Sequence, residues 1–440
     1  MRDDFPNQDD LLAYLQEQLP AAEAAALEAR LAQSPALREE LERTRTVLAL
    51  VQEASEEANI RRANELLERT IRAGASDLHL DLTRDGAVAR LRVDGVLHES
   101  ESLSGEVGRG ALHRLKQLLG MDLVEQQRPA DGRCDLVLDN KRYDLRGSFL
   151  PTLYGGRLVI RVFDASTVQL GLDRLGFFAD ELEAVRRLTR LPSGLLVAAG
   201  PTGAGKTTVL YSLLHELARP EVNVLSIEDP VELALPWVAQ VRLQPAIGNT
   251  YPSLLRAILR QDPDVIMVGE VRDTETLQMS IQAALTGHLV LATLHARDAV
   301  GVIRRLVEMG AEPYLLAEVL VGVIGCRLAR LNCPHCASEV AAQGSAPAVL
   351  GLDPRGLTHQ AGAGCERCRQ TGYRGRSGIF EVVEVSAALA DAIANGASDQ
   401  VLREQAFAGE LPDFRGHAVR LVAEGRTTPG EAARVLSLEW

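Results

Sequence analysis

The sequence predicts an α/β fold with a parallel sheet wrapped by helices, a smaller mixed α/β domain before it, and helical segments at both ends. Two observations carry this prediction. Between residues 173 and 325, apolar runs of strand length alternate with segments of helical periodicity, which is the pattern of a parallel sheet covered by helices. Between residues 59 and 164, shorter strands with alternating polar and apolar residues are joined by turns that contain Asp-Gly.

The length and net charge of the chain limit the number of domains and the kinds of partner that it can have. A chain of 440 residues has room for two to four domains. Its net charge of −13 argues against nucleic acid as the main partner, because that binding depends on Lys and Arg neutralising phosphates. No apolar stretch approaches the length of a membrane span, and the first residues lack the apolar core of a signal peptide. We therefore expect a cytoplasmic protein.

Residues 1–55 contain no glycine and are rich in Leu, Ala and Glu, which indicates short helices. Asp9 or Asp10 can cap the first helix, Pro20 opens the second, and Ser34 with Pro35 begins the third. The leucine pattern fits a small amphipathic bundle that docks on a partner, and it fits equally a solvated helical extension without a specific role.

Residues 56–165 are expected to form the mixed α/β domain. A helix ends near Gly74, and apolar residues then alternate with polar ones over 78–82, as in a half-buried strand. A second strand at 88–93, a helix at 111–119, and strands near Cys134, Tyr143 and Leu158 complete the domain. Residues 166–172 read as a linker to the next domain.

Residues 173–330 are expected to form the parallel sheet, with strands at 195–199, 222–227, 265–268 and 289–293. Directly after the first strand comes a complete G-x-x-x-x-G-K-T phosphate loop, which a helix to Leu217 follows. Its glycines let backbone N–H groups face one anion, Lys206 reaches the terminal phosphates of ATP, and Thr207 ligates Mg²⁺. The nucleotide-binding residues are therefore Gly200, Pro201, Thr202, Gly203, Ala204, Gly205, Lys206, Thr207 and Thr208.

Polar residues follow the other strands of this sheet, at the edge where ligands bind in such folds. Glu228 follows the second strand and Glu270 the third, while the fourth runs to His295, with His288 just before it. A glutamate there can orient or deprotonate the attacking water, and a histidine can sense the γ-phosphate. The alternative is that an acidic residue merely caps the next helix, which we expect of Asp273.

Four of the six cysteines form two Cys-x-x-Cys pairs in residues 331–380, ahead of a helical region at 381–440. In a reducing compartment this pattern favours a metal over disulfides, and two such pairs match a tetrahedral zinc site. Because four protein ligands leave no open position, the Zn²⁺ should be structural. His335 should point away. The predicted ligands are Cys333, Cys336, Cys365 and Cys368.

Three stretches around the sheet, residues 226–232, 260–273 and 286–295, occur in a fixed order after the phosphate loop, and three more, 75–80, 92–95 and 128–133, lie upstream of it. The first three resemble the Asp box, Walker B box and His box of the secretion ATPases that power type II secretion and type IV pilus assembly. The upstream three look like the signatures of that family's domain before the motor. The resemblance runs from about residue 59 to about residue 385, and it implies a RecA-like P-loop ATPase core preceded by a PAS-like α/β domain. One departure is Cys326, where the family usually has Gln, which we expect to affect only local packing.

The resemblance implies a hexameric motor at the cytoplasmic face of the inner membrane, acting through a platform protein on pilin-like subunits. It also implies that two arginines of the preceding domain, Arg146 and Arg161, reach the γ-phosphate, although such arginines are commonly plain surface residues. The cysteine module is usual in secretion and pilus-assembly members, which favours assembly over retraction. Residues 1–55 match no cyclic-dinucleotide site of the family, so we expect no such binding.

Two other functions remain open at this level. A DNA-directed or DNA-uptake ATPase shares the same core, although the acidic balance and the zinc module argue against it. A non-catalytic scaffold with a vestigial loop is the other, and the intact Lys206, Thr207, Glu228 and Glu270 argue against that.

Overall fold

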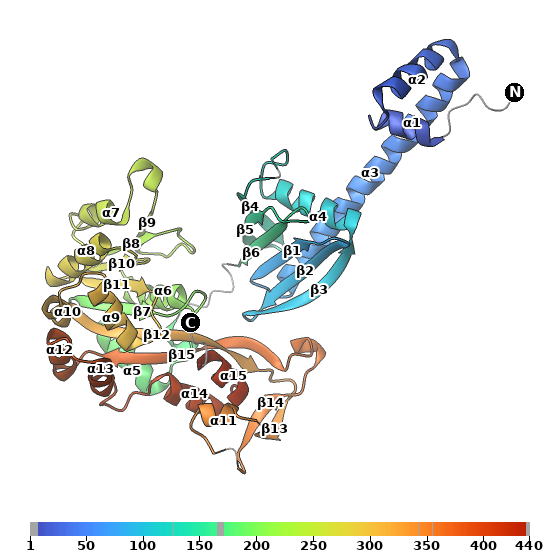
Figure 1. Ribbon diagram of the computed structural model, residues 1–440. Helices are drawn as coiled ribbons and strands as arrows, with labels where there is room; N and C mark the ends of the chain where they lie inside the picture. The colour runs from blue at the N-terminus through green and yellow to red at the C-terminus, as the bar shows by residue number, and fades with distance from the viewer. Residues whose placement is uncertain (1–7, 126, 165–170, 343, 354, 437–440) are drawn as a thin grey trace. The chain divides into compact units, whose positions relative to one another are not determined.

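The structure is a computed structural model that describes residues 8–125, 127–164, 171–342, 344–353 and 355–436. The chain divides into two compact units, Met1–Asp164 and Ala165–Trp440, and each is described by itself (Figure 1). Most of the expected linker, residues 166–170, lies outside the described residues. None of the helices in the ranges above combines the length and apolar character that a membrane crossing requires.

The first unit begins with the three expected helices, α1 (Gln8–Leu15), α2 (Ala21–Gln33) and α3 (Pro35–Arg72). The Ser34 hydroxyl accepts a hydrogen bond of 3.2 Å from the Leu37 amide, which confirms this residue as the cap of α3. Helix α3 is much longer than expected because no glycine, and no proline after Pro35, interrupts it before Gly74. The domain boundary expected at residues 55/56 therefore falls inside one continuous helix.

The rest of the first unit is an antiparallel sheet of order β3-β2-β1-β6-β5-β4. Its strands are β1 (Asp77–Leu82), β2 (Gly86–Val93), β3 (Val96–Ser104), β4 (Ala130–Leu138), β5 (Lys141–Leu150) and β6 (Arg157–Phe163). Helix α4 (Gly105–Leu118) packs with α3 against β1 and β2, and buries leucines such as Leu80 and Leu115. Strand β3 was not predicted, since its run of Glu and Ser residues hides the alternation expected of a strand.

The second unit contains a seven-stranded sheet of order β15-β12-β7-β11-β10-β8-β9, parallel except for β15. The strands are β7 (Gly194–Ala199), β8 (Val224–Glu228), β9 (Val238–Arg242), β10 (Val265–Val268), β11 (Leu289–Leu294), β12 (Leu320–Asn332) and β15 (Tyr373–Glu384). All four predicted strands are present within two residues of their expected bounds.

Helices cover both faces of this sheet, as Figure 1 shows. Helices α5 (Ala179–Thr189) and α6 (Lys206–Leu217) pack on one face. The other face carries α7 (Tyr251–Ile258), α8 (Thr274–Leu285), α9 (Ala299–Glu308) and α10 (Pro313–Val319). Within β7, Leu196 packs on the face that α5 and α6 cover, whereas Leu195 and Val197 pack on the face that α7 to α10 cover. Burial on both faces explains the continuous apolar runs and confirms the α/β fold class.

The cysteine region leaves the sheet between β12 and β15, which are neighbours in it. It contains the strand pair β13 (Ala337–Ala341) and β14 (Thr358–Gly362) and the short helix α11 (Ala346–Val349). The chain then forms α12 (Ala387–Ala394), α13 (Asp399–Ala406), α14 (Phe414–Ala423) and α15 (Pro429–Leu436). The boundaries expected at 330/331 and 380/381 thus fall within two strands of the main sheet.

Candidate active site

The phosphate loop joins β7 to α6, and its glycines have backbone angles that other residues rarely adopt. Gly203 and Gly205 have φ angles of 76° and 93°. A side chain at Gly200 would place its Cβ 2.4 Å from the Cys326 carbonyl oxygen on β12. Gly205 is the residue before α6, so the free N–H groups of the first helical turn face the loop. This arrangement forms an anion site at a helix N-terminus.

Lys206 folds back over its own loop. Its ammonium donates to the carbonyl oxygens of Gly200 at 2.7 Å and Pro201 at 3.0 Å. Burial lowers the pKa of Lys206, against the opposing influence of Cys326 and Glu270. Thr207 and Thr208 follow in the same helical turn and are half-buried. The loop therefore holds one ammonium that can exchange carbonyl oxygens for phosphate oxygens.

Glu270 and His295 lie beside Lys206, although they follow different strands. The Lys206 Nζ is 3.4 Å from His295 Nδ1, and His295 Nε2 is 3.5 Å from Glu270 Oε1. Strands β10 and β11 are parallel neighbours, so their carboxyl ends meet at one edge of the sheet. The structure thus brings together three of the predicted site residues.

The charges in this group favour an ionised glutamate and a neutral histidine. Burial by itself would raise the pKa of Glu270, but a 2.7 Å hydrogen bond from Arg272 and its charge hold that pKa below its ordinary value. Burial, and then the nearby charge of Lys206, lower the pKa of His295. A carboxylate beside the phosphate loop can orient a water molecule or accept its proton.

Glu228 occupies a different environment at the end of β8. It is only 3% exposed and accepts hydrogen bonds from Ser226 Oγ at 2.6 Å and Gln240 Nε2 at 2.9 Å. It also accepts a short hydrogen bond from the hydroxyl of Tyr211 on α6. Burial and this bond raise the pKa of Tyr211. In this geometry Glu228 links α6 to β8 and β9.

His288 lies at the amino end of β11, whereas His295 follows its carboxyl end. The six residues of β11 lie between them, and seven steps along an extended strand span about 23 Å. The His288 ring instead lies 2.8 Å from the Ala283 carbonyl oxygen and 3.2 Å from Thr286 Oγ1. The structure therefore does not bring His288 to Lys206 within this chain.

Arg272 and Thr293, which were not singled out from the sequence, also lie at this edge of the sheet. Arg272 pairs with Glu270, and the only sequence signal was its place two residues after that glutamate. The Thr293 hydroxyl donates 2.5 Å to the Gly269 carbonyl oxygen, which fixes the end of β11 against the turn before Glu270. Asp273 caps α8 through a 2.8 Å bond from Thr276, as expected.

In the first unit, Arg146 and Arg161 lie directly opposite each other on β5 and β6. The register extends this pair into one row across five strands. From β2 to β4 the row reads Arg92, Asp77, Arg161, Arg146 and Arg133. Asp77 Oδ1 accepts from Arg161 Nε at 3.1 Å, and Asp144 Oδ2 accepts from Arg146 Nη2 at 3.0 Å. The Arg161 side chain remains 68% exposed, so it is accessible to an anion.

The four cysteine sulfurs of the second unit lie within 4.8 Å of one another. Cys333 and Cys365 are 3.9 Å apart, and Cys336 and Cys368 are 3.8 Å apart, measured between Sγ atoms. A tetrahedron with Zn–S bonds of about 2.3 Å has sulfur–sulfur edges of about 3.8 Å. The residues present therefore fit a zinc ion. His335 lies against Arg367 instead, and is not part of the group.

Comparison with known proteins identifies the family. A family model described as "Type II/IV secretion system protein" matches residues 52–434. Type II secretion system protein E of Pseudomonas aeruginosa is 41% identical over 388 residues, which cover 88% of this chain and 77% of that one. Type II secretion system ATPase E of Vibrio cholerae is 39% identical over 377 residues, covering 86% and 75%.

Solved structures show the same fold at lower identity. The ATPase DotB of Legionella pneumophila superposes with a TM-score of 0.61 at 18% identity, covering 85% of this chain and 95% of that one. The pilus retraction motor PilT with bound ADP gives a TM-score of 0.55 at 24% identity, with coverage of 85% and 96%. The chain therefore belongs to the type II/IV secretion system protein family, and it is an ATPase with a RecA-like core.

Proposed function

We propose that this chain is the hexameric motor that hydrolyses ATP to drive type II protein secretion or type IV pilus assembly. It works at the cytoplasmic face of the inner membrane, through a platform protein. The similarity to type II secretion proteins E over most of the chain supports the assignment. The observation that carries the chemistry is the contact of Lys206 with His295 and of His295 with Glu270 at the phosphate loop.

In the proposed mechanism the loop residues 200–208 bind the phosphates of ATP, and the Thr207 hydroxyl would be a ligand of Mg²⁺. The Mg²⁺ ion would neutralise charge on the phosphate oxygens. Lys206 exchanges its bonds to the Gly200 and Pro201 carbonyl oxygens for phosphate oxygens. Glu270, ionised at neutral pH, orients the attacking water and accepts its proton as the bond to the γ-phosphorus forms and ADP leaves.

The arginine row gives the motor a second contact with the γ-phosphate. We assign this contact to Arg146 and Arg161, which Asp144 and Asp77 hold in place while no anion is bound. A guanidinium that binds the γ-phosphate loses its partner on hydrolysis, and this loss can drive a movement between domains. His288 is left out of the proposed phosphate contacts because of its position at the far end of β11.

The four cysteines are proposed to bind one structural Zn²⁺. The ion would hold the excursion between β12 and β15 in its folded shape. Cys333→Ser or Cys365→Ser should lower bound zinc measured by elemental analysis, and should lower the thermal midpoint of the chain. The matched control is Cys134→Ser, which lies in the other unit. Unchanged zinc in both variants would contradict the site.

The motor assignment is tested with the purified chain and with a deletion strain. Mass photometry with and without MgATP should show a hexamer, and phosphate release should be independent of added DNA. Strong stimulation by DNA would favour a DNA-directed ATPase instead, and full turnover by a monomer would contradict the hexamer. In cells, deletion should abolish either secretion of exported proteins or surface pili, which decides between the two systems.

A further inference from the structure

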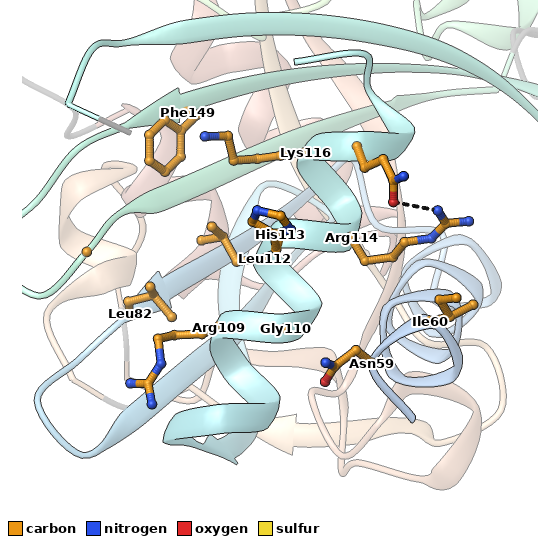
Figure 2. Close-up of a pocket in the computed structure, with 12 residues that line it drawn as sticks. Asn59, Ile60, Leu82, Arg109, Gly110, Leu112, His113, Arg114, Lys116 and Phe149 are labelled. Atoms are coloured by element: carbon orange, nitrogen blue, oxygen red, sulfur yellow. Dashed lines mark hydrogen bonds between the residues drawn. The ribbon is translucent and has the colours of Figure 1, made fainter. Parts of the chain in front are cut away.

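The first unit contains a pocket of about 410 Å³ that the ATP chemistry does not use. It lies beside α4, between residues of α3, the end of β1 and the end of β5. Figure 2 shows Lys116 reaching from α4 toward the Phe149 ring, with Leu112 and Leu82 on the same side of the helix. A volume of this size suits a small organic molecule.

Lys116 is the unusual residue of this pocket. It is only 1% exposed, yet within the described residues its ammonium has neither a hydrogen-bond acceptor nor an ion-pair partner. Its one recorded contact is with the Phe149 ring, whose centroid lies 4.0 Å from Nζ. A lysine side chain that is this little exposed ordinarily has a charged or hydrogen-bonding partner, and a ring face supplies only part of that stabilisation. The missing partner points to an anion in the pocket.

The Lys and Arg residues of the lining all carry positive charge. Arg109, His113 and Lys116 follow one another along α4 at helical spacing, and Arg114 is also part of the lining. Among the lining residues there is no aspartate or glutamate. In a chain with a net charge of −13, this local excess of basic groups favours an anionic ligand.

The shape of the pocket depends on close packing around α4. A Cβ at Gly110 would lie 2.2 Å from the Asn59 side chain, so the glycine allows α3 to approach α4. The apolar part of the lining comes from Ile60, Leu82, Leu112 and Phe149. Such walls exclude water around a charged group and also favour an apolar ligand body.

We propose that this pocket binds a small organic anion whose carboxylate or phosphate group meets the Lys116 ammonium, while its apolar body lies against Leu82 and Leu112. Arg109, at the more exposed end of the basic line, adds attraction for the same group. This ligand site is separate from the phosphate loop and does not depend on the proposed motor function.

Isothermal titration calorimetry on the full chain tests the proposal, with excess MgADP present to occupy the phosphate loop. The probes are octanoate, octyl phosphate and uncharged octanol. We expect one of the two anions to bind, and octanol to bind at least about tenfold more weakly, since a charged hydrogen bond is lost. The preferred anion identifies the headgroup, carboxylate or phosphate.

The variant Lys116→Met keeps the length of the side chain and removes its charge. It should weaken binding of the preferred anion at least about tenfold. The matched control Lys141→Met changes an exposed lysine of the same unit that does not line the pocket, and should bind normally. If circular dichroism shows that Lys116→Met is unfolded, the variant Arg109→Gln at the exposed rim is the test instead. Its affinity for the preferred anion should fall about threefold. Absence of binding by both anions, equal binding of octanol, or unchanged affinity in the deciding variant would each overturn the proposal.

Discussion

The phosphate loop of the second unit and the arginine row of the first both present positive charge to an anion, but they are built differently. In the loop, Lys206 is held by carbonyl oxygens of its own loop, five and six residues away. In the row, Arg161 and Asp77 are 84 residues apart in the chain and meet through strand register. The loop is thus a local structure, whereas the row exists only once the sheet has formed.

This difference has a functional consequence. The loop's positive group is partly buried and has exchangeable neutral partners, so binding a phosphate restores charge pairing there. The row's arginines already have carboxylate partners, and Arg161 is well exposed to solvent, so an additional anion gains less from them. We therefore expect the loop to account for most of the catalysis and the row to contribute a smaller effect.

The largest expected effect comes from Lys206→Ala. Loss of the ammonium should reduce ATP turnover by at least about a hundredfold, because Lys206 is the only lysine in the sequence of the second unit. Phosphate release measures this, with Lys141→Ala of the first unit as the matched control. Near-normal turnover in Lys206→Ala would remove the loop from the mechanism and reverse the ranking of the two regions.

We expect the two glutamates at the strand ends to differ in role, Glu270 in catalysis and Glu228 in stability. Glu270→Gln should bind a fluorescent ATP analogue normally but turn over about a hundredfold more slowly, because the proton acceptor is lost. Glu228→Gln should mainly lower stability, by about 1–3 kcal/mol, since it weakens buried hydrogen bonds to Tyr211, Ser226 and Gln240. Turnover and denaturant midpoints measured for both variants decide the matter. If turnover falls more in Glu228→Gln, that residue is the general base.

The same local-versus-register distinction explains what the sequence could reveal. The phosphate loop, the buried strands and the Asp273 cap were predictable because each depends on residues close together in the chain. The hydrogen bond from Tyr211 to Glu228 joins a helix to a strand, and the sequence pattern of neither segment predicts it. Membership of β12 and β15 in the main sheet was likewise hidden, because the cysteine excursion separates these two neighbours.

Lys116 shows a signal that the sequence did contain. Leu112, Leu115 and Leu119 mark the apolar face of α4, and Lys116 lies on that face rather than on the polar one. A single basic residue there is easily taken for a solvated side chain whose stem covers the core. Only its burial in the structure and the missing partner distinguish the two cases.

A smaller effect is expected in the arginine row. Arg161→Gln should lower turnover by about tenfold or more, since arginines that bind a transferring phosphoryl group stabilise its charge. Asp77→Asn leaves the Arg161 guanidinium itself in place and weakens the contact that orients it, so the loss of turnover should stay below about fivefold. Arg92→Gln, in the same row but outside the proposed γ-phosphate pair, is the matched control. Equal losses in Arg92→Gln and Arg161→Gln would mean that the row acts only through its total charge.

The smallest effect, and the sharpest contrast between the regions, is in the response to pH. Glu270 must be unprotonated to accept a proton, and Arg272 holds the pKa of Glu270 below that of an ordinary glutamate. Turnover should therefore persist as the pH falls to the ordinary pKa of a glutamate, and should decline only at lower pH. In Arg272→Gln, burial of Glu270 is no longer offset by its main partner, its pKa should rise, and the acid limb of the pH–rate profile should move to higher pH. Arginines remain charged throughout this range, so Arg161→Gln should lower the profile without moving its acid limb. An acid limb that shifts equally in Arg272→Gln and Arg161→Gln would show that the group being titrated is not Glu270.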